Sequence, residues 1–429
     1  QAGIGGVLMK KLIMISVGAV FVVSFCFGAA LAEEMSLKSL LAEAVANNPS
    51  LKADKQRTMG KEARVAFEAS LEDPVFSIEF EDIPEDDISL GSSETRRYTL
   101  SQSFPFPGKR SLKKTIAGKE ASAYASGYDA SVIEVKYLVK EAYFACAYLF
   151  EAITVAEDIK KTLEDMSAIA SVRYSTGKSL QQDLIKINVE TALAQKDVIE
   201  FSAEKDAALA RLKTVLGRPI GSPLGGRAVL SRDRAVFDGA FLLKSALLNN
   251  PELGMVKKEL EAGELSVKLA AKEYYPDFMV SVSPMERDGG IESYDFMFGL
   301  NIPLWFGKNQ SRLSEARANA EALRAVSVAR ANDKSSEVAE TIIRVTSGAD
   351  TLTLYETALL PQSELSLESA MKNYRSFDAD FISLLDSERE LKRMRLDYLK
   401  TLLEYRKAVA SLERAVGEDF ENFEERERR

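Results

Sequence analysis

Few residues of this chain could carry out chemistry. None of its 429 residues is a histidine, and its only cysteines are Cys26 and Cys146. The commonest general base and the commonest metal ligand are therefore absent. The sequence also lacks a P-loop and the G-x-G-x-x-G, C-x-x-C and G-x-S-x-G motifs. We therefore expect that the protein is not an enzyme and that it holds neither a cofactor nor a resident metal ion.

The first 32 residues have the pattern of a secretory signal. Lys10 and Lys11 precede an uncharged apolar run, which ends in the small residues of Ala30-Leu31-Ala32 that suit signal peptidase. We expect residues 1–32 to be removed, with Met9 as the initiator and residues 1–8 upstream of it. A membrane-spanning helix is the alternative, but no basic cluster follows the run to stop its transfer.

The chain without this segment is acidic. Removing two lysines leaves 54 basic and 65 acidic residues, a net charge of −11. We therefore expect no nucleic-acid partner. Cys146 would then be the single remaining cysteine, so no intramolecular disulfide could form. Phe25 is larger than the small residue that lipidation of Cys26 would favour.

The most informative pattern is a long internal repeat. Asn47-Asn48-Pro49 recurs as Asn249-Asn250-Pro251, and Arg173-Tyr174-Ser175 recurs as Asn373-Tyr374-Arg375. The period exceeds that of solenoid repeats, so each copy is expected to be a whole structural half. The expected divisions are a first repeat at 33–217, a linker at 218–240, a second repeat at 241–417 and a charged tail at 418–429.

Each half is expected to contain a pair of long antiparallel helices. From Lys109 to Val172 the apolar positions recur at intervals of three and four, which is typical of a coiled-coil seam. Such a helix is about 96 Å long, whereas the return from Leu180 to Leu216 covers about 55 Å. A shorter helix over 49–71, about 35 Å long, has nearly the missing length. The matching segments of the second half are 308–373, 380–416 and 251–273, and Pro361 should kink the first of these.

Between the short and long helices of each half lie two runs in which apolar and polar residues alternate. This period of two predicts amphipathic strands. Their apolar residues are Phe76, Ile78, Phe80, Tyr98, Leu100, Phe104, Phe278, Val280, Val282, Tyr294, Phe296, Phe298, Leu300 and Ile302. Polar loops are expected at 81–94 and 286–292. The aromatic faces and the export signal favour membrane strands, and because four strands cannot close a barrel, two or three copies must combine.

The order and spacing of these elements resemble the TolC-type outer-membrane efflux protein family from Leu37 to about Gly417. The resemblance rests on both Asn-Asn-Pro motifs, on LSQSFPFPGK at 100–109, on Tyr174-Ser175-Thr176-Gly177 and on AVASLERAVG at 408–417. It implies a mainly α-helical fold with a membrane β-barrel. The duplicated halves would form a periplasmic tunnel of long antiparallel coiled-coil helices, and four strands per chain would contribute to a 12-stranded trimeric barrel.

The same resemblance implies the outer-membrane channel of a tripartite efflux system. The protein would be a homotrimer in the outer membrane of a Gram-negative cell, in contact with its lipid, a periplasmic adaptor (membrane fusion) protein and an inner-membrane pump. The sequence at 104–110 is similar to that of the heavy-metal branch, whose pumps are of the resistance-nodulation-division (RND) type. The alternatives are a type I secretion or drug-efflux duct paired with an ATP-driven exporter, and a soluble periplasmic coiled-coil scaffold.

The prolines and glycines after the strands are expected to turn each strand into a helix. Proline ends the pairing of a strand and glycine permits a sharp bend, which assigns this role to Pro105, Pro107 and Gly108, and to Pro303 and Gly307 in the second half. The neighbouring basic residues Lys109, Arg110 and Lys308 would reach lipid headgroups.

The turns between the long helices are the expected gate. Tyr174 and Gly177 mark the first turn and Tyr374 marks the second. The family pattern places two acidic residues after the second turn, where they narrow the closed tunnel; Asp386 matches one of them, but Ser383 stands at the other. The further gate candidates are Asp183, Asp378 and Asp380, and the alternative for all of these acids is an ordinary solvated charge at a helix end.

Overall fold

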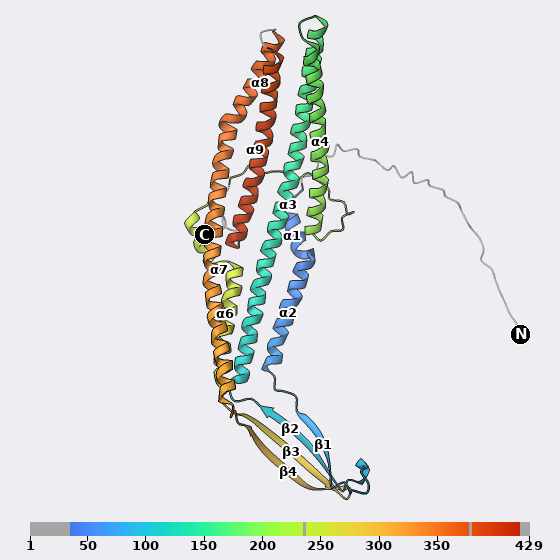
Figure 1. Cartoon of the computed structure of the whole chain (residues 1–429), viewed down its shortest axis with the longest axis vertical. Helices are drawn as coiled ribbons and strands as arrows, with labels where there is room; N and C mark the ends of the chain where they lie inside the picture. Colours follow the sequence, from blue (N-terminus) through green and yellow to red (C-terminus); the bar gives the residue numbers. More distant parts are fainter. Residues whose placement is uncertain (1–34, 235–236, 377–379, 421–429) are drawn as a thin grey trace, which may run out of the picture.

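The protein is a long helical rod with a small β-sheet at one end (Figure 1). The computed structural model describes residues 35–234, 237–376 and 380–420. The expected signal segment, Cys26, Asp378 and most of the charged tail lie outside the described residues. No helix in these described ranges is both long and apolar enough to cross a membrane.

The described residues of the first half contain four α-helices, α1 (Leu37–Asn47), α2 (Pro49–Ala69), α3 (Lys109–Ser175) and α4 (Gln181–Val215). Helix α3 runs almost the length of the rod, while α2 and α4 lie end to end beside it (Figure 1). The sequence therefore predicted both the long helix and its two partners. Helix α1 was not among the predicted elements.

The second half repeats this arrangement with α5 (Gly239–Asn249), α6 (Pro251–Lys272), α7 (Phe306–Leu354), α8 (Leu360–Arg375) and α9 (Phe381–Val416). The helix expected over 308–373 is divided by a π-helical turn, Tyr355–Leu359. Pro361 is the second residue of α8, just after this turn. Because proline has no amide N–H, the regular hydrogen-bond ladder is interrupted where the kink was predicted.

The repeated Asn-Asn-Pro motif ties the short helix of each half to the returning helix. In the first half, Asn48 Oδ1 accepts the Ser50 amide at 2.9 Å, and its Nδ2 donates to the carbonyl of Val215 at 2.9 Å. In the second half, Asn250 Oδ1 accepts the Glu252 amide and its Nδ2 donates to the Ala415 carbonyl, both at 2.9 Å. One side chain therefore caps one helix and satisfies the end of another.

The four strands form one antiparallel sheet in the order β1 (Val75–Glu81), β2 (Thr95–Phe104), β3 (Asp277–Arg287) and β4 (Gly290–Asn301). The central β2–β3 pair joins the two halves. The loop expected over 286–292 is shorter than predicted, because β3 and β4 continue to a tight turn at Asp288 and Gly289, both with positive φ. Such a turn fits the twist of a hairpin.

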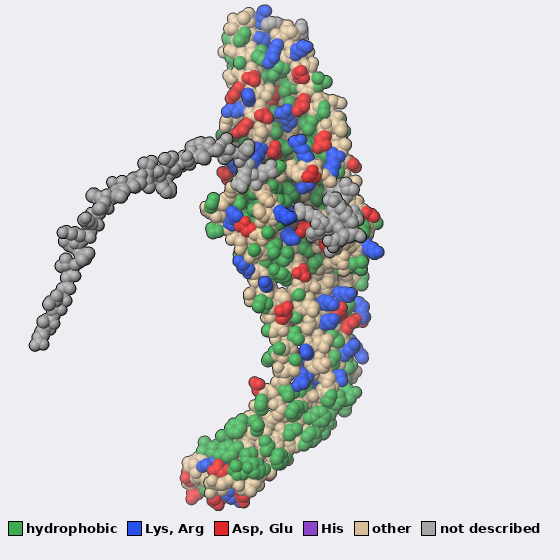
Figure 2. Space-filling view, turned by 180° about the vertical axis from the view of Figure 1, so that it is seen from behind, with side chains coloured by type: hydrophobic (Ala, Val, Ile, Leu, Met, Phe, Trp, Pro, Cys, Tyr) green, Lys and Arg blue, Asp and Glu red, His purple; other side chains and the backbone are tan. Residues whose placement is uncertain are grey.

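The register separates two faces of the sheet. Phe76, Leu100, Val282 and Phe296 form one row across the four strands. On the opposite face, the hydroxyls of Thr99 and Ser283 are 2.9 Å apart. Phe296 is 81% exposed in the single chain, and hydrophobic side chains cover much of the sheet surface in Figure 2. The sheet therefore has one apolar and one polar face, as the alternation of residues predicted.

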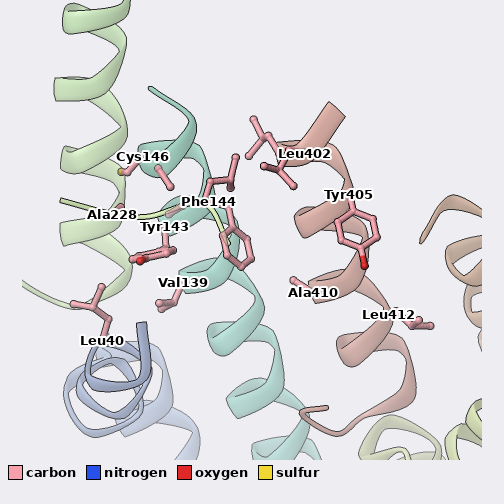
Figure 3. Close-up of a cluster of buried hydrophobic side chains, with 14 of the residues drawn as sticks. Leu40, Val139, Tyr143, Phe144, Cys146, Ala228, Leu402, Tyr405, Ala410 and Leu412 are labelled. Atoms are coloured by element: carbon pink, nitrogen blue, oxygen red, sulfur yellow. The ribbon is translucent and has the colours of Figure 1, made fainter. Parts of the chain in front are cut away.

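The main apolar core lies in the middle of the rod, where the two halves meet. Val139, Tyr143 and Cys146 of α3 lie between Leu40 of α1 and the side chains of α9 (Figure 3). Cys146 is fully buried, and burial raises the pKa of its thiol to about 12. Cys146 is therefore a packing residue of this core, where it acts as a small hydrophobic side chain.

Candidate functional site

The junction between β2 and α3 is built around a buried lysine. Gly108 precedes α3 with a φ of 91°, in the left-handed region that favours glycine. Lys109 follows it and is only 3% exposed. Its ammonium lies 2.9 Å from Asp277 and 3.6 Å from Glu273, and it donates to the carbonyl of Tyr275 at 3.1 Å. The prediction that Lys109 reaches lipid headgroups is therefore wrong, because Glu273 at the end of α6 and Asp277 at the start of β3 hold its ammonium inside the protein.

The second junction has a different geometry. Pro303 lies between β4 and α7, and the chain turns over residues 302–306 through short carbonyl–amide hydrogen bonds. Gly307 lies in the first turn of α7 and is not among the glycines with positive φ. The bend predicted for Gly307 is therefore wrong, because this turn is completed before the chain reaches it. Trp305 is 80% exposed beside the sheet, where an aromatic ring suits a membrane interface.

Replacing Gly108 by alanine should destabilise the protein by about 1 kcal/mol, because an L-residue is disfavoured at this positive φ. The matched control is Gly118→Ala within α3, where an added methyl group meets no atom within 4 Å. That change should stabilise the helix by about 0.5–1 kcal/mol. Urea unfolding of the detergent-solubilised protein measures both. Equal midpoint shifts of the same sign would contradict the proposed bend at Gly108.

At the far end of the rod lies the first turn, between α3 and α4. The residues predicted there form hydrogen bonds with their neighbours in the sequence. Gly177 has a φ of 72°, and its amide donates to the carbonyl of Tyr174 at 2.9 Å. Asp183 accepts the Ser179 hydroxyl at 2.8 Å and the Leu180 amide at 3.3 Å. These bonds cap the start of α4. Asp183 is therefore placed as a structural cap at this turn.

At the second turn, between α8 and α9, Asp380 and Asp386 have different environments. Asp380 is the N-cap of α9 and accepts the Ser383 amide at 3.1 Å. Hydrogen bonds from Ser383 lower the pKa of the Asp380 carboxyl. Asp386 has an exposed side chain, with the guanidinium of Arg389 3.6 Å away as its nearest cation. Of the described gate candidates, Asp386 is the acid whose carboxylate is not used as a helix cap.

A contact between the two turns joins the halves at the tip. The Arg173 guanidinium lies 4.0 Å from the centre of the Tyr374 ring and also donates to the carbonyl of Tyr374. Tyr374 is 1% exposed, whereas its counterpart Tyr174 is 45% exposed. The repeated tyrosines therefore have different environments, and one of them packs under a cation from the other half.

Sequence reasoning missed the ion pairs that link α4 to α9 below the turns. Arg389 pairs with Glu190, and Lys392 lies 2.5 Å from Asp197. It also missed Glu388, a carboxyl that is 1% exposed. Its position in the sequence could have indicated this burial, because Glu388 lies at helical spacing between the apolar residues Leu384 and Leu391. An acid within such a pattern marks a buried charge.

The described residues contain no group of three or more histidine, cysteine, aspartate or glutamate side chains that could hold a metal ion. If several copies of the chain surround one axis, the exposed Asp386 carboxylates form a ring of negative charge at the tip. The contacts between the two helix pairs at the tip can also form or break. Such an arrangement can gate a passage.

Comparison with known proteins assigns this arrangement to a family. The sequence model of the outer membrane efflux protein family matches residues 40–218 and 242–418, one match in each half. The cobalt-zinc-cadmium resistance protein CzcC of Cupriavidus metallidurans is 25% identical over 329 residues, 75% of this chain and 78% of CzcC. The pyoverdine export outer membrane protein OpmQ of Pseudomonas putida is 20% identical over 65% of this chain and 61% of OpmQ.

The fold is similar to that of solved membrane channels. The structure of CusC, described in terms of transmembrane channel formation, matches with a TM-score of 0.77 over 90% of this chain and 93% of CusC, at 18% identity. The helical rod and the four-stranded sheet are therefore a fold that this chain shares with CusC. The chain belongs to the outer membrane efflux protein family, whose members are passive channels of the Gram-negative outer membrane rather than enzymes.

Proposed function

We propose that three copies of this chain form the exit duct of a tripartite system that exports metal cations. The observation that carries this proposal is the similarity to CzcC, a cobalt-zinc-cadmium resistance protein. The exposed Asp386 at the tip supports it, because three carboxylates around one axis would attract cations. In this proposal the metal cations are the cargo of the duct.

The proposed partners supply the energy for transport, which a passive duct does not provide. A passive duct needs a pump, for which we propose an inner-membrane protein of the RND type, and a periplasmic adaptor that joins the two. The proposed organisation keeps residues 1–32 as the export signal, 33–217 and 241–417 as the two repeats, 218–240 as the linker and 418–429 as a charged tail.

Deletion of the gene tests the cargo. Cells lacking the protein should retain more zinc, cobalt or cadmium after metal loading, and a plasmid copy should restore export. Cross-linking in the native envelope, followed by detergent purification and mass spectrometry, should recover an RND pump and its adaptor. Unchanged metal content together with recovery of an ATP-driven exporter would contradict the proposal.

The second candidate cargo is a small organic compound. The similarity to OpmQ, a pyoverdine export protein, favours this alternative. The same deletion strain distinguishes the two, since an organic cargo predicts sensitivity to drugs or retention of a siderophore while metal content stays normal.

Asp386→Asn should reduce the preference of the channel for cations. The variant removes one exposed charge per chain at the tip, and we expect the cation-to-anion permeability ratio to fall about two- to fivefold at low salt. Reversal potentials in planar bilayers measure this ratio. Glu368→Gln, which removes an exposed charge from α8, is the control and should leave the ratio close to that of the wild type. An unchanged ratio in D386N would remove Asp386 from the gate.

A further inference from the structure

Glu388 is a carboxyl buried in the apolar contact between the helices of the tip. On α9, Leu384, Leu385 and Leu391 lie buried on the same face, and Glu388 is 1% exposed. Its Oε1 atom has no hydrogen-bond partner within the described part of the chain. Leu384 and Leu385, one helical turn before Glu388, belong to an apolar cluster that includes Leu163 and Met166 from α3 and Ile187 from α4. A buried acid without a hydrogen bond is costly when it is ionised and much less so when it is protonated.

The charges nearest to Glu388 hold α9 against α4. Arg389 pairs with Glu190, and Lys392, one helical turn beyond Glu388, lies 2.5 Å from Asp197. Both cations thus have partners on α4. Glu190 also repels a negative charge at Glu388, while Lys392 and Arg389 attract it.

The other helices around the tip also contribute charged residues that pair away from Glu388. On α8, Glu364 lies 3.0 Å from Arg395, and the Ser366 hydroxyl lies 3.3 Å from that of Ser387. In the part of α3 that carries the apolar cluster, Lys160 and Glu164 pair with each other at 3.8 Å. Among the described residues, Glu388 is therefore the acid of this region that is both buried and without a partner cation in contact.

We propose that Glu388 is a proton-operated release for the tip of the duct, which holds α9 against α4 when it is protonated and loosens them when it is ionised. Two effects act in the same direction. An ionised Glu388 gains hydration only if the apolar contact opens. It also competes with Glu190 and Asp197 for Arg389 and Lys392, and so weakens the ion pairs that clamp the two helices. This inference rests on the proposed function as a gated duct.

The sign and size of the effect follow from linkage. Burial raises the pKa of Glu388 to about 7 in the closed tip. In an open, hydrated tip the pKa would return towards about 4.3. The closed tip then binds the proton more tightly, so acid favours closure and a rise in pH favours opening. Between pH 6 and pH 8 the ratio of open to closed tips should increase about tenfold per chain.

The test compares the full-length protein with Glu388→Gln in planar bilayers, with the pH of the tunnel side varied from 6 to 8. The wild type should show an open-to-closed ratio that rises with pH by about tenfold for each chain that opens. The glutamine variant, which stays neutral, should lose this rise and remain in its low-conductance state. Glu390→Gln is the control, because it removes a more exposed carboxylate two residues along α9 that is paired with Arg393, and it should keep the wild-type response.

Infrared spectroscopy provides a readout that does not depend on current. A protonated carboxyl band should weaken between pH 6 and pH 8 in the wild type and in E390Q, and the part of this band that belongs to Glu388 should be absent from E388Q. If E388Q keeps the pH response, or if the band is absent at pH 6 in the wild type, the proposed role of Glu388 is wrong. The proposed function as an export duct is not affected by that result. If no variant conducts at any pH, the proposed function fails, and the infrared band still decides whether Glu388 changes its protonation state near neutral pH.

Discussion

Replacing Lys140 by methionine is expected to lower the free energy of unfolding by about 3–5 kcal/mol, because it leaves buried acids without their cation. The Lys140 ammonium lies 2.6 Å from Glu413 and 2.9 Å from Asp419, and both the Lys140 and Glu413 side chains are 12% exposed. Lys136 remains 2.6 Å from Asp419 and can hold that acid. Glu413 has no such second cation among its described contacts, so most of the loss should arise there.

The loss should depend on pH in a defined direction. Burial raises the pKa of Glu413, and the attraction of Lys140 partly opposes this rise. Without Lys140 the pKa of Glu413 increases further. A folded-state pKa above the unfolded value means that the folded protein binds the proton more tightly, so stability is gained as the pH falls and lost as it rises. The difference between K140M and the wild type should therefore shrink in acid.

Urea unfolding of the detergent-solubilised protein at several pH values measures this difference. Lys196→Met is the matched control, because the Lys196 and Glu200 side chains are 59% and 53% exposed and pair only at the surface. Its effect should stay within about 1 kcal/mol. If K140M and K196M have equal effects, or if K140M is most destabilised in acid, the buried network does not stabilise the fold as argued.

The sequence predicted those parts of the fold that depend on local signals. The Asn-Asn-Pro motif is one example, because an asparagine cap followed by proline starts a helix whatever surrounds it. The alternation of Phe76, Ile78 and Phe80 is another, since a period of two fixes which side chains share a face. The kink at Pro361 follows from a missing amide. Each of these features depends on residues a few positions apart.

The features that sequence reasoning missed depend on residues far apart in the chain. Lysine is usually found at the surface, but Lys109 is buried because its ammonium pairs with Asp277. This partner is about 170 residues away in the sequence and is therefore not visible as a local signal. Gly307 occupies the position that corresponds to Gly108 in the repeat, but the preceding turn removes the need for its conformational freedom. The environment of Glu388 likewise depends on Glu190 and on helices of both halves. Pairing across the duplicated halves therefore sets the chemistry of the tip.

The contact between the two turns is expected to hold the tip closed, so Arg173→Ala should open it. The change removes the cation from the face of the Tyr374 ring, at 4.0 Å, and the hydrogen bond to the Tyr374 carbonyl. Charge-assisted hydrogen bonds and cation–π contacts of partly buried groups each contribute up to about 2 kcal/mol. A loss of about 2 kcal/mol corresponds to a roughly 30-fold increase in the ratio of open to closed tips. Single-channel recording in planar bilayers measures this ratio directly.

Two changes at Tyr374 separate this contact from general packing. The Tyr374 hydroxyl is buried and has no hydrogen-bond partner among the described residues. Tyr374→Phe keeps the ring under Arg173 and should therefore conduct like the wild type, with unchanged or slightly increased stability. Tyr374→Leu removes the ring and should open the tip to an extent approaching that of R173A. If Y374F opens the tip as much as R173A does, the hydroxyl and not the cation–π contact holds it closed; if R173A conducts like the wild type, the two halves are held together by the ion pairs between α4 and α9 instead.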